Sequence, residues 1–76
     1  MYKLSKFDTV SYSDEPGHEI ILFTRSAKDK ITGVLRLKAE FTESWQAAKT
    51  RQAILAAGQV DLSNWTEANP YSPPDF

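Results

Sequence analysis

The sequence predicts a small α+β domain in which a three-stranded antiparallel sheet is followed by one helix packed on one face, in the order β-β-β-α. Strand-like stretches fill the first half of the chain, and a run of strong helix formers follows them. The last residues are rich in proline and aromatic side chains, which predicts an extended tail. Because the chain has 76 residues, we expect one domain, residues 1–69, followed by a tail of residues 70–76.

The first expected strand is interrupted. Apolar residues alternate from Tyr2 to Tyr12, but polar residues break the alternation and Phe7 has the opposite parity. This pattern predicts a strand with a bulge or a break near Phe7. Pro16 and Gly17 supply a fixed φ angle and then a permissive one, which predicts a turn after this strand.

The next two stretches predict a hairpin. Residues 19–25 (EIILFTR) have apolar side chains on both parities, as expected of a central strand that is covered on both faces. Residues 31–41 (ITGVLRLKAEF) alternate between apolar and polar side chains for most of their length, which is the clearest strand pattern in the chain. The polar loop SAKDK between them is too short for a parallel crossover, so we expect the two strands to be antiparallel.

Residues 43–57 predict the helix, with Thr42 as its N-cap and Gly58 as its C-terminal stop. At about 100° per residue, Trp45, Ala48 and Leu55 fall on one face of this helix. We expect Trp45 and Leu55 to provide most of the area that the helix buries against the sheet.

The segment after the helix is expected to be mostly irregular. One short helical turn can begin at Asp61 or Ser63, and we expect Trp65 to be buried in the core. Asn69 precedes Pro70, and a residue before proline is pushed out of the α region. Beyond this point the sequence favours an extended conformation of the polyproline type.

The composition argues against several classes of protein. The chain contains no cysteine, so neither a disulfide framework nor a thiolate zinc site is expected. No secretion signal is recognisable, and the longest apolar run, residues 20–23, is far shorter than the about 20 residues of a membrane-spanning helix. We expect a cytoplasmic protein with no membrane partner and no cofactor.

Few residues point to catalysis. His18 is the only histidine, and it is either a base or metal ligand or a half-exposed turn residue beside a strand. Asp14 and Glu15 are adjacent carboxylates, but adjacent residues of a turn usually point apart. The three glycines are isolated and form no phosphate-binding loop. We therefore expect a protein that is not an enzyme.

The centre of the chain is basic although the formal net charge is −1. Residues 25–51 contain seven basic and three acidic residues, and both flanking stretches are acidic. The strand alternation brings part of this charge onto one face of the sheet, with the candidate binding residues Arg25, Lys28, Arg36 and Lys38. Such a surface suits a protein partner with an acidic surface, while a solvated face with ion pairs is the alternative. A nucleic acid is the less favoured partner, because the whole chain is slightly acidic.

One face of the sheet is expected to need a cover. The central strand is apolar on both parities, and a single helix covers only one of its faces. Val34, with Ile21 and Phe23, then has to be covered by the tail, by a second copy of the chain or by another protein. The tail adds Tyr71 and Phe76 as candidate partner-binding residues.

The opening MYKL and the combination of WQ with LAAG are weakly similar to short accessory proteins encoded beside phage tail-fibre genes. This resemblance implies a small phage or mobile-element protein of a kind that binds and blocks a host machine. The residues themselves favour a non-catalytic protein-binding module: an inhibitor, an adaptor or an assembly factor. The alternatives are a small nucleic-acid-binding protein that uses the same basic residues, and a homodimeric structural or virion component whose apolar sheet face pairs with itself.

Overall fold

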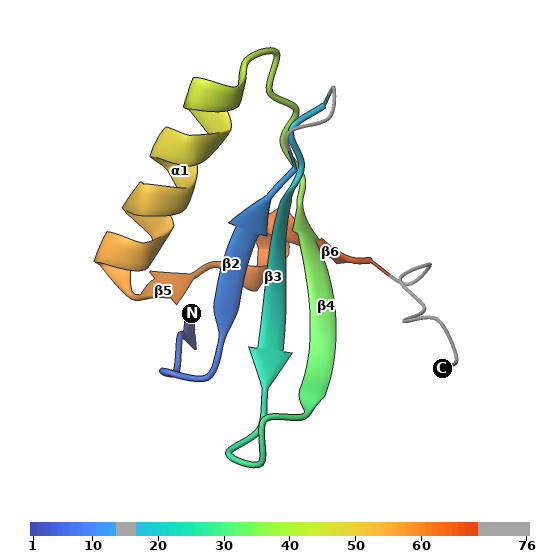
Figure 1. The fold of residues 1–76 in the computed structure, drawn as a ribbon, viewed down its shortest axis with the longest axis vertical. Coiled ribbons are helices and arrows are strands. Elements are labelled where there is room, and N and C mark those ends of the chain that lie inside the picture. Colours follow the sequence, from blue (N-terminus) through green and yellow to red (C-terminus); the bar gives the residue numbers. More distant parts are fainter. Residues whose placement is uncertain (14–16, 69–76) are drawn as a thin grey trace.

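The computed structural model describes residues 1–13 and 17–68, and its fold is α+β with antiparallel sheets (Figure 1). The coarse class that the sequence predicts is therefore confirmed. Along the chain the elements are β1 (Tyr2–Lys3), β2 (Thr9–Tyr12), β3 (Ile20–Arg25), β4 (Ile31–Leu37), α1 (Ser44–Ala57), β5 (Gln59–Val60), the 3-10 helix η1 (Leu62–Asn64) and β6 (Trp65–Glu67).

The predicted three-stranded sheet is wrong. The strands form a four-stranded sheet in the order β2-β3-β4-β6 and a two-stranded sheet of β1 with β5. Two short strands that the sequence did not reveal, β5 and β6, follow the helix and pair with β1 and β4. They are two and three residues long, which is too short for an alternating pattern to stand out.

The predicted break near Phe7 is confirmed, and Asp8 explains it. The carboxylate of Asp8 accepts hydrogen bonds from the Tyr2 hydroxyl (2.7 Å), the Ser5 backbone N–H (2.9 Å) and the Arg25 backbone N–H (3.1 Å). These bonds turn the chain between β1 and β2 and tie the turn to the end of β3. Desolvation raises the pKa of Asp8, but the hydrogen bonds from Ser5, Tyr2 and Arg25 outweigh it and hold the pKa below its usual value.

The hairpin of β3 and β4 forms as predicted. Leu22 lies opposite Leu35 and Phe23 lies opposite Val34 in an antiparallel register. The register shifts between Thr24 and Arg25, so the alternation of side chains that holds in the middle of β3 is not kept at its end.

The core lies behind the four-stranded sheet. Figure 1 shows α1 beside β2 and the segment from β5 to β6 passing behind the sheet, so the helix and this segment together cover one face. Arg51 Nε on the helix donates a hydrogen bond of 2.6 Å to the Val10 carbonyl, which occupies a backbone acceptor of β2. The buried residues of the described chain are Val10, Ile20, Leu22, Ala47, Val60 and Trp65.

The helix does not pack through the face that the sequence predicts. Trp45 and Leu55 are 58% and 45% exposed, whereas Ala47 is fully buried and Ile54 packs against the core. The prediction that Trp45 and Leu55 provide most of the buried area is therefore wrong. Trp65 is only 6% exposed, as predicted, and it belongs to the core cluster.

The helix begins one residue later than expected and has a different N-cap. Glu43 is the N-cap and makes no side-chain capping bond, so the prediction of Thr42 is wrong. Gln46 Oε1 instead accepts hydrogen bonds from Thr42 N–H (3.2 Å) and Thr42 Oγ1 (3.3 Å). Gly58 ends the helix as predicted, with φ of 70° and its N–H bonded to the Ile54 carbonyl.

The expected short helical turn after α1 is present as η1. Asp61 is its N-cap and accepts a hydrogen bond from the Ser63 backbone N–H at 3.0 Å. The predicted tail, residues 70–76, lies outside the described residues. Within residues 1–13 and 17–68, no helix has both the length and the apolar character to cross a membrane.

Candidate functional site

The face of the four-stranded sheet that lies away from the core is the candidate site, and we call it the open face. Leu22 is fully buried, so its neighbours Ile21 and Phe23 point to the opposite side of β3. Ile21 lies opposite Arg36 on β4, and Phe23 lies opposite Val34. All four side chains are half-buried. In the described part of the chain no helix crosses this face, because α1 lies along the β2 edge (Figure 1).

A hollow of about 580 Å³ opens on this face. Its floor comes from the middle of β3 and β4, and its rim reaches the end of β6. The residues that line it are Glu19, Ile21, Phe23, Val34, Arg36, Glu67 and Ala68. Aliphatic and aromatic side chains on the floor with a few charged groups at the rim are the usual chemistry of a binding site.

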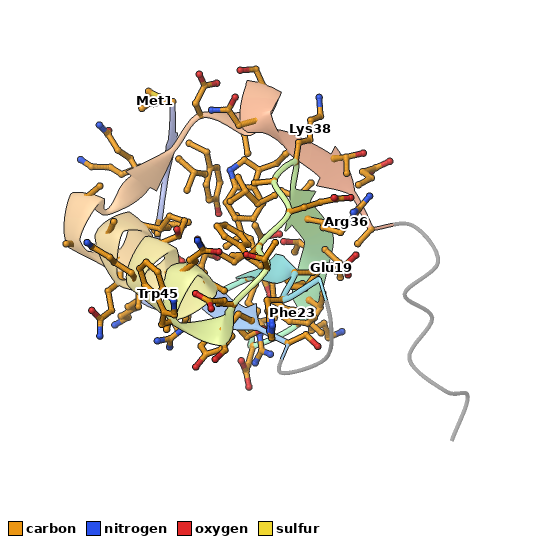
Figure 2. The ribbon with its side chains drawn as sticks, turned by 90° about the horizontal axis from the view of Figure 1, so that it is seen from above. Met1, Glu19, Phe23, Arg36, Lys38 and Trp45 are labelled. Atoms are coloured by element: carbon orange, nitrogen blue, oxygen red, sulfur yellow. The ribbon has the colours of Figure 1, made fainter. Side chains whose placement is uncertain are left out.

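An ion pair lies at one side of the hollow. Arg36 Nη1 and Glu19 Oε1 are 3.3 Å apart, and their side chains are 43% and 52% exposed. A pair this exposed contributes at most about 1 kcal/mol to stability. Within this pair, Arg36 still presents further N–H donors, because a guanidinium carries five of them in a fixed plane. Figure 2 shows Arg36 and Glu19 together on the side of the sheet away from the helix.

Of the predicted site residues, Val34 and Arg36 are the two that the structure brings together. They belong to the same strand, point to the same face and line the same hollow. The alternation of β4 was sufficient to predict this, because alternate residues of a strand share a face.

Arg25 and Lys28 lie at the far end of the hairpin. Arg25 Nη1 is 3.4 Å from Asp29 Oδ1, and the Arg25 backbone N–H is held by Asp8. Lys28 is exposed in the turn between β3 and β4, where its backbone N–H donates to Ser26 Oγ at 3.3 Å. Neither residue lines the hollow.

Lys38 follows the end of β4 and points away from Arg36. Its Nζ donates a hydrogen bond to the Ser63 carbonyl (3.2 Å), and its backbone N–H donates to the Asn64 carbonyl (2.8 Å). Figure 2 shows Lys38 apart from Arg36 and Glu19. The basic residues of the expected stripe therefore lie at three separate places. The other two candidates, Tyr71 and Phe76, lie outside the described residues.

Five lining residues were not among the predicted site residues: Glu19, Ile21, Phe23, Glu67 and Ala68. The sequence placed Ile21 and Phe23 on a face that needs a cover, but it gave no indication of the other three. Glu19 directly precedes β3, so its position beside Arg36 follows from the antiparallel register that places Ile21 opposite Arg36. Glu67 and Ala68 reach the hollow through the pairing of β6 with β4, and β6 left no pattern in the sequence that would have placed them there.

His18 lies just before β3. Its φ is 44°, and its Nδ1 lies 3.1 Å from the Ser13 carbonyl oxygen, which requires a proton on Nδ1 for a hydrogen bond. Across the ranges that the structure describes, no three His, Cys, Asp or Glu side chains come together as a metal site.

Comparisons of the chain with protein-family models, with curated proteins and with solved structures find no match. The weak similarity to phage accessory proteins gains no support from them. The open face therefore has to be interpreted from its own geometry.

Proposed function

We propose that the chain is a non-catalytic protein-binding module, of the inhibitor, adaptor or assembly-factor type, and that the open face is its binding surface. The observation that carries this proposal is the hollow of about 580 Å³, with Ile21, Phe23 and Val34 on its floor. These side chains lie on the sheet face opposite the core, so their burial does not contribute to closing that core. Apolar side chains gathered in a hollow at the surface are typical of sites where a partner docks.

Arg36 indicates the chemistry of the partner. It lines the hollow, and its side chain keeps 43% of its surface exposed while pairing with Glu19. A guanidinium binds a carboxylate through two parallel N–H bonds and is desolvated at low cost. A partner segment with an apolar side chain for the floor and an Asp or Glu beside it for Arg36 fits this arrangement.

Two observations support the non-catalytic part of the proposal. Among the residues that the structure describes, those that line the hollow include no Ser, Thr, Cys or His, so this lining holds no nucleophile and base pair of the Ser–His or Cys–His kind. His18 is engaged with the Ser13 carbonyl and is not among the lining residues.

A selection from a random peptide library displayed on phage tests the proposal. The immobilised full chain is the target, and Val34→Asp places a carboxylate in the middle of the hollow floor. Leu55→Asp is the matched control, because Leu55 is an exposed aliphatic residue on the helix, away from the open face. We expect peptides that bind the wild type and Leu55→Asp but not Val34→Asp, enriched in an apolar residue next to Asp or Glu.

Circular dichroism checks that both variants are folded, and Val34→Thr serves as a milder change that keeps the β-branched shape. The proposal fails if no enriched peptide distinguishes Val34→Asp from the wild type. Arg36→Gln tests the acidic character of the partner. If the selected peptides bind Arg36→Gln as tightly as the wild type, the docking surface stands and the proposal of an acidic partner fails.

A further inference from the structure

The described chain ends at the rim of the hollow. β6 pairs antiparallel with β4, with Thr66 opposite Arg36. The Ala68 backbone N–H then donates a hydrogen bond of 2.9 Å to the Val34 carbonyl, and Ala68 is one of the lining residues. Whatever follows Ala68 therefore starts beside the floor of the proposed binding site.

The residues that follow are poorly suited to lengthen β6. The register that places Thr66 opposite Arg36 and bonds Ala68 to Val34 would place Pro70 opposite Thr32. The ladder there requires an N–H from residue 70, and proline has none. Pro73 and Pro74 also lack this donor. The same prolines favour the extended polyproline conformation, which needs no ladder partner and packs its rings against aromatic and aliphatic surfaces.

The segment is long enough to cover the hollow. Residues 70–76, which we call the terminal segment, reach about 22 Å at about 3.1 Å per residue. Neighbouring strands are about 4.8 Å apart, so the distance from β6 across β4 to β3 is only about 10 Å. Tyr71 and Phe76 are the aromatic residues of this segment.

We propose that the terminal segment occupies the hollow of its own chain and packs its aromatic side chains on Ile21 and Val34, so that a partner has to displace it. The competition with a partner rests on the proposed function, whereas the contact itself does not. Attachment at Ala68 keeps the segment at a high effective concentration near the hollow. The prolines lower the conformational entropy that the segment loses when it is ordered.

Occupancy of the hollow by the terminal segment is expected to be partial. Two half-buried aliphatic side chains offer little area, and seven residues have to be ordered to cover them. The apparent affinity of a partner for the same hollow is then proportional to the fraction of chains in which the hollow is free, and it is lower than the affinity for an empty hollow. We expect this competition to weaken binding by about two- to five-fold.

A spin label tests the contact directly. Because the chain has no cysteine, Asp75→Cys provides a single attachment site in the terminal segment. We expect the label to broaden the NMR signals of the Ile21 and Val34 methyl groups more than those of Val60, which is buried in the core. A label at Leu55→Cys, on the exposed side of α1, is the control and should leave Ile21 and Val34 sharp.

A mixed sample separates this contact from one between two copies. One chain carries the isotope and no spin label, and the other carries the spin label and no isotope. We expect no broadening in this sample. Broadening of Ile21 and Val34 here would show that a second copy supplies the segment and would overturn the proposal, as would equal broadening of all methyl groups in the singly labelled chain.

The double variant Tyr71→Ser with Phe76→Ser tests the competition. It should shift the methyl signals of Ile21 and Val34 and tighten the binding of a hollow-specific displayed peptide by about two- to five-fold. Unchanged signals and unchanged affinity contradict the proposal. If the label contacts are present but no peptide binds the hollow, the proposed function fails and the contact of the terminal segment stands. If peptides bind the hollow and the label contacts are absent, the contact of the terminal segment fails and the proposed function stands.

Discussion

The two tryptophans give a matched test of how the helix and the last strand share the core. Trp65 is 6% exposed and lies in the hydrophobic cluster, whereas Trp45 is 58% exposed on α1. Trp65→Ala removes a side chain that buries about 150 to 250 Å². At about 25 cal/mol per Å² this area corresponds to about 4 to 6 kcal/mol. Truncations of buried Phe or Trp to Ala typically cost about 3 to 5 kcal/mol, and we expect the free energy of unfolding to fall by that amount.

Trp45→Ala is the control and should change the free energy of unfolding by less than about 0.5 kcal/mol. It removes a hydrogen bond from the Trp45 indole N–H to the Glu43 carboxylate, but alanine has a higher helix propensity than tryptophan and offsets part of this loss. Urea unfolding followed by circular dichroism at 222 nm measures both variants on the same scale.

A domain of this length has a total stability of only about 4 to 11 kcal/mol, so Trp65→Ala can leave too little folded protein to measure. Trp65→Phe is the milder substitution, and we expect it to cost about half as much. Fluorescence adds a second readout, because Trp45→Phe leaves only the buried indole of Trp65 and should emit at shorter wavelength than Trp65→Phe. Equal losses of stability at the two positions, or a larger loss at Trp45, would refute the packing described here.

Two further changes probe the turn that Asp8 organises and the end of the helix. Tyr2→Phe removes the hydrogen bond to Asp8 and should lower the free energy of unfolding by about 1 kcal/mol in urea unfolding near neutral pH. The hydrogen bond to Asp8 raises the pKa of Tyr2, and desolvation and the nearby carboxylate add to this effect, while the pKa of Asp8 is lowered. The stabilisation is therefore lost as pH falls through the lowered pKa of Asp8, below about 4, and as pH rises through the raised pKa of Tyr2, above about 10. The difference between wild type and Tyr2→Phe should shrink at both extremes, and a difference that is constant with pH would contradict this. Gly58→Ala forces a side chain into a backbone with φ of 70° and should lower the free energy of unfolding, measured in urea, by about 1 kcal/mol. Ala57→Gly in the last turn is the control for composition.

The parts of the fold that the sequence predicts correctly are those with a repeated local pattern. β4 alternates over most of its seven residues, and β3 is apolar on both parities, so their pairing and the shared face of Val34 and Arg36 followed directly. The helix was placed to within one residue, because a run of helix formers ends at a glycine.

The helix orientation could not be predicted from the same pattern. Its sequence is rich in alanine, so several faces are almost equally apolar, and the bulky residues were taken as the buried ones. The structure buries Ala47 and leaves Trp45 exposed, while Trp65 from β6 belongs to the core. Tertiary packing decides which face of the helix is buried, and the local sequence pattern carries no information about that packing.

The basic stripe is dispersed for two local reasons. The register shift at the end of β3 removes Arg25 from the alternation of that strand. Lys38 lies just beyond β4, where its backbone and side chain bond to the segment around η1. Pairing with Glu19 and Asp29 then uses part of the charge of Arg36 and Arg25. Strand parity alone locates a side chain only as far as the regular ladder extends.

The affinity of a selected peptide for wild type, Val34→Asp and Leu55→Asp tests the central claim most directly. The claim is that the open face, and no other surface, is the binding site. A carboxylate buried against an apolar partner side chain is costly, so Val34→Asp should weaken binding by at least about ten-fold, which is about 1.4 kcal/mol. Leu55→Asp should bind as tightly as the wild type. Equal affinities for Val34→Asp and the wild type, with both proteins folded, would contradict the account.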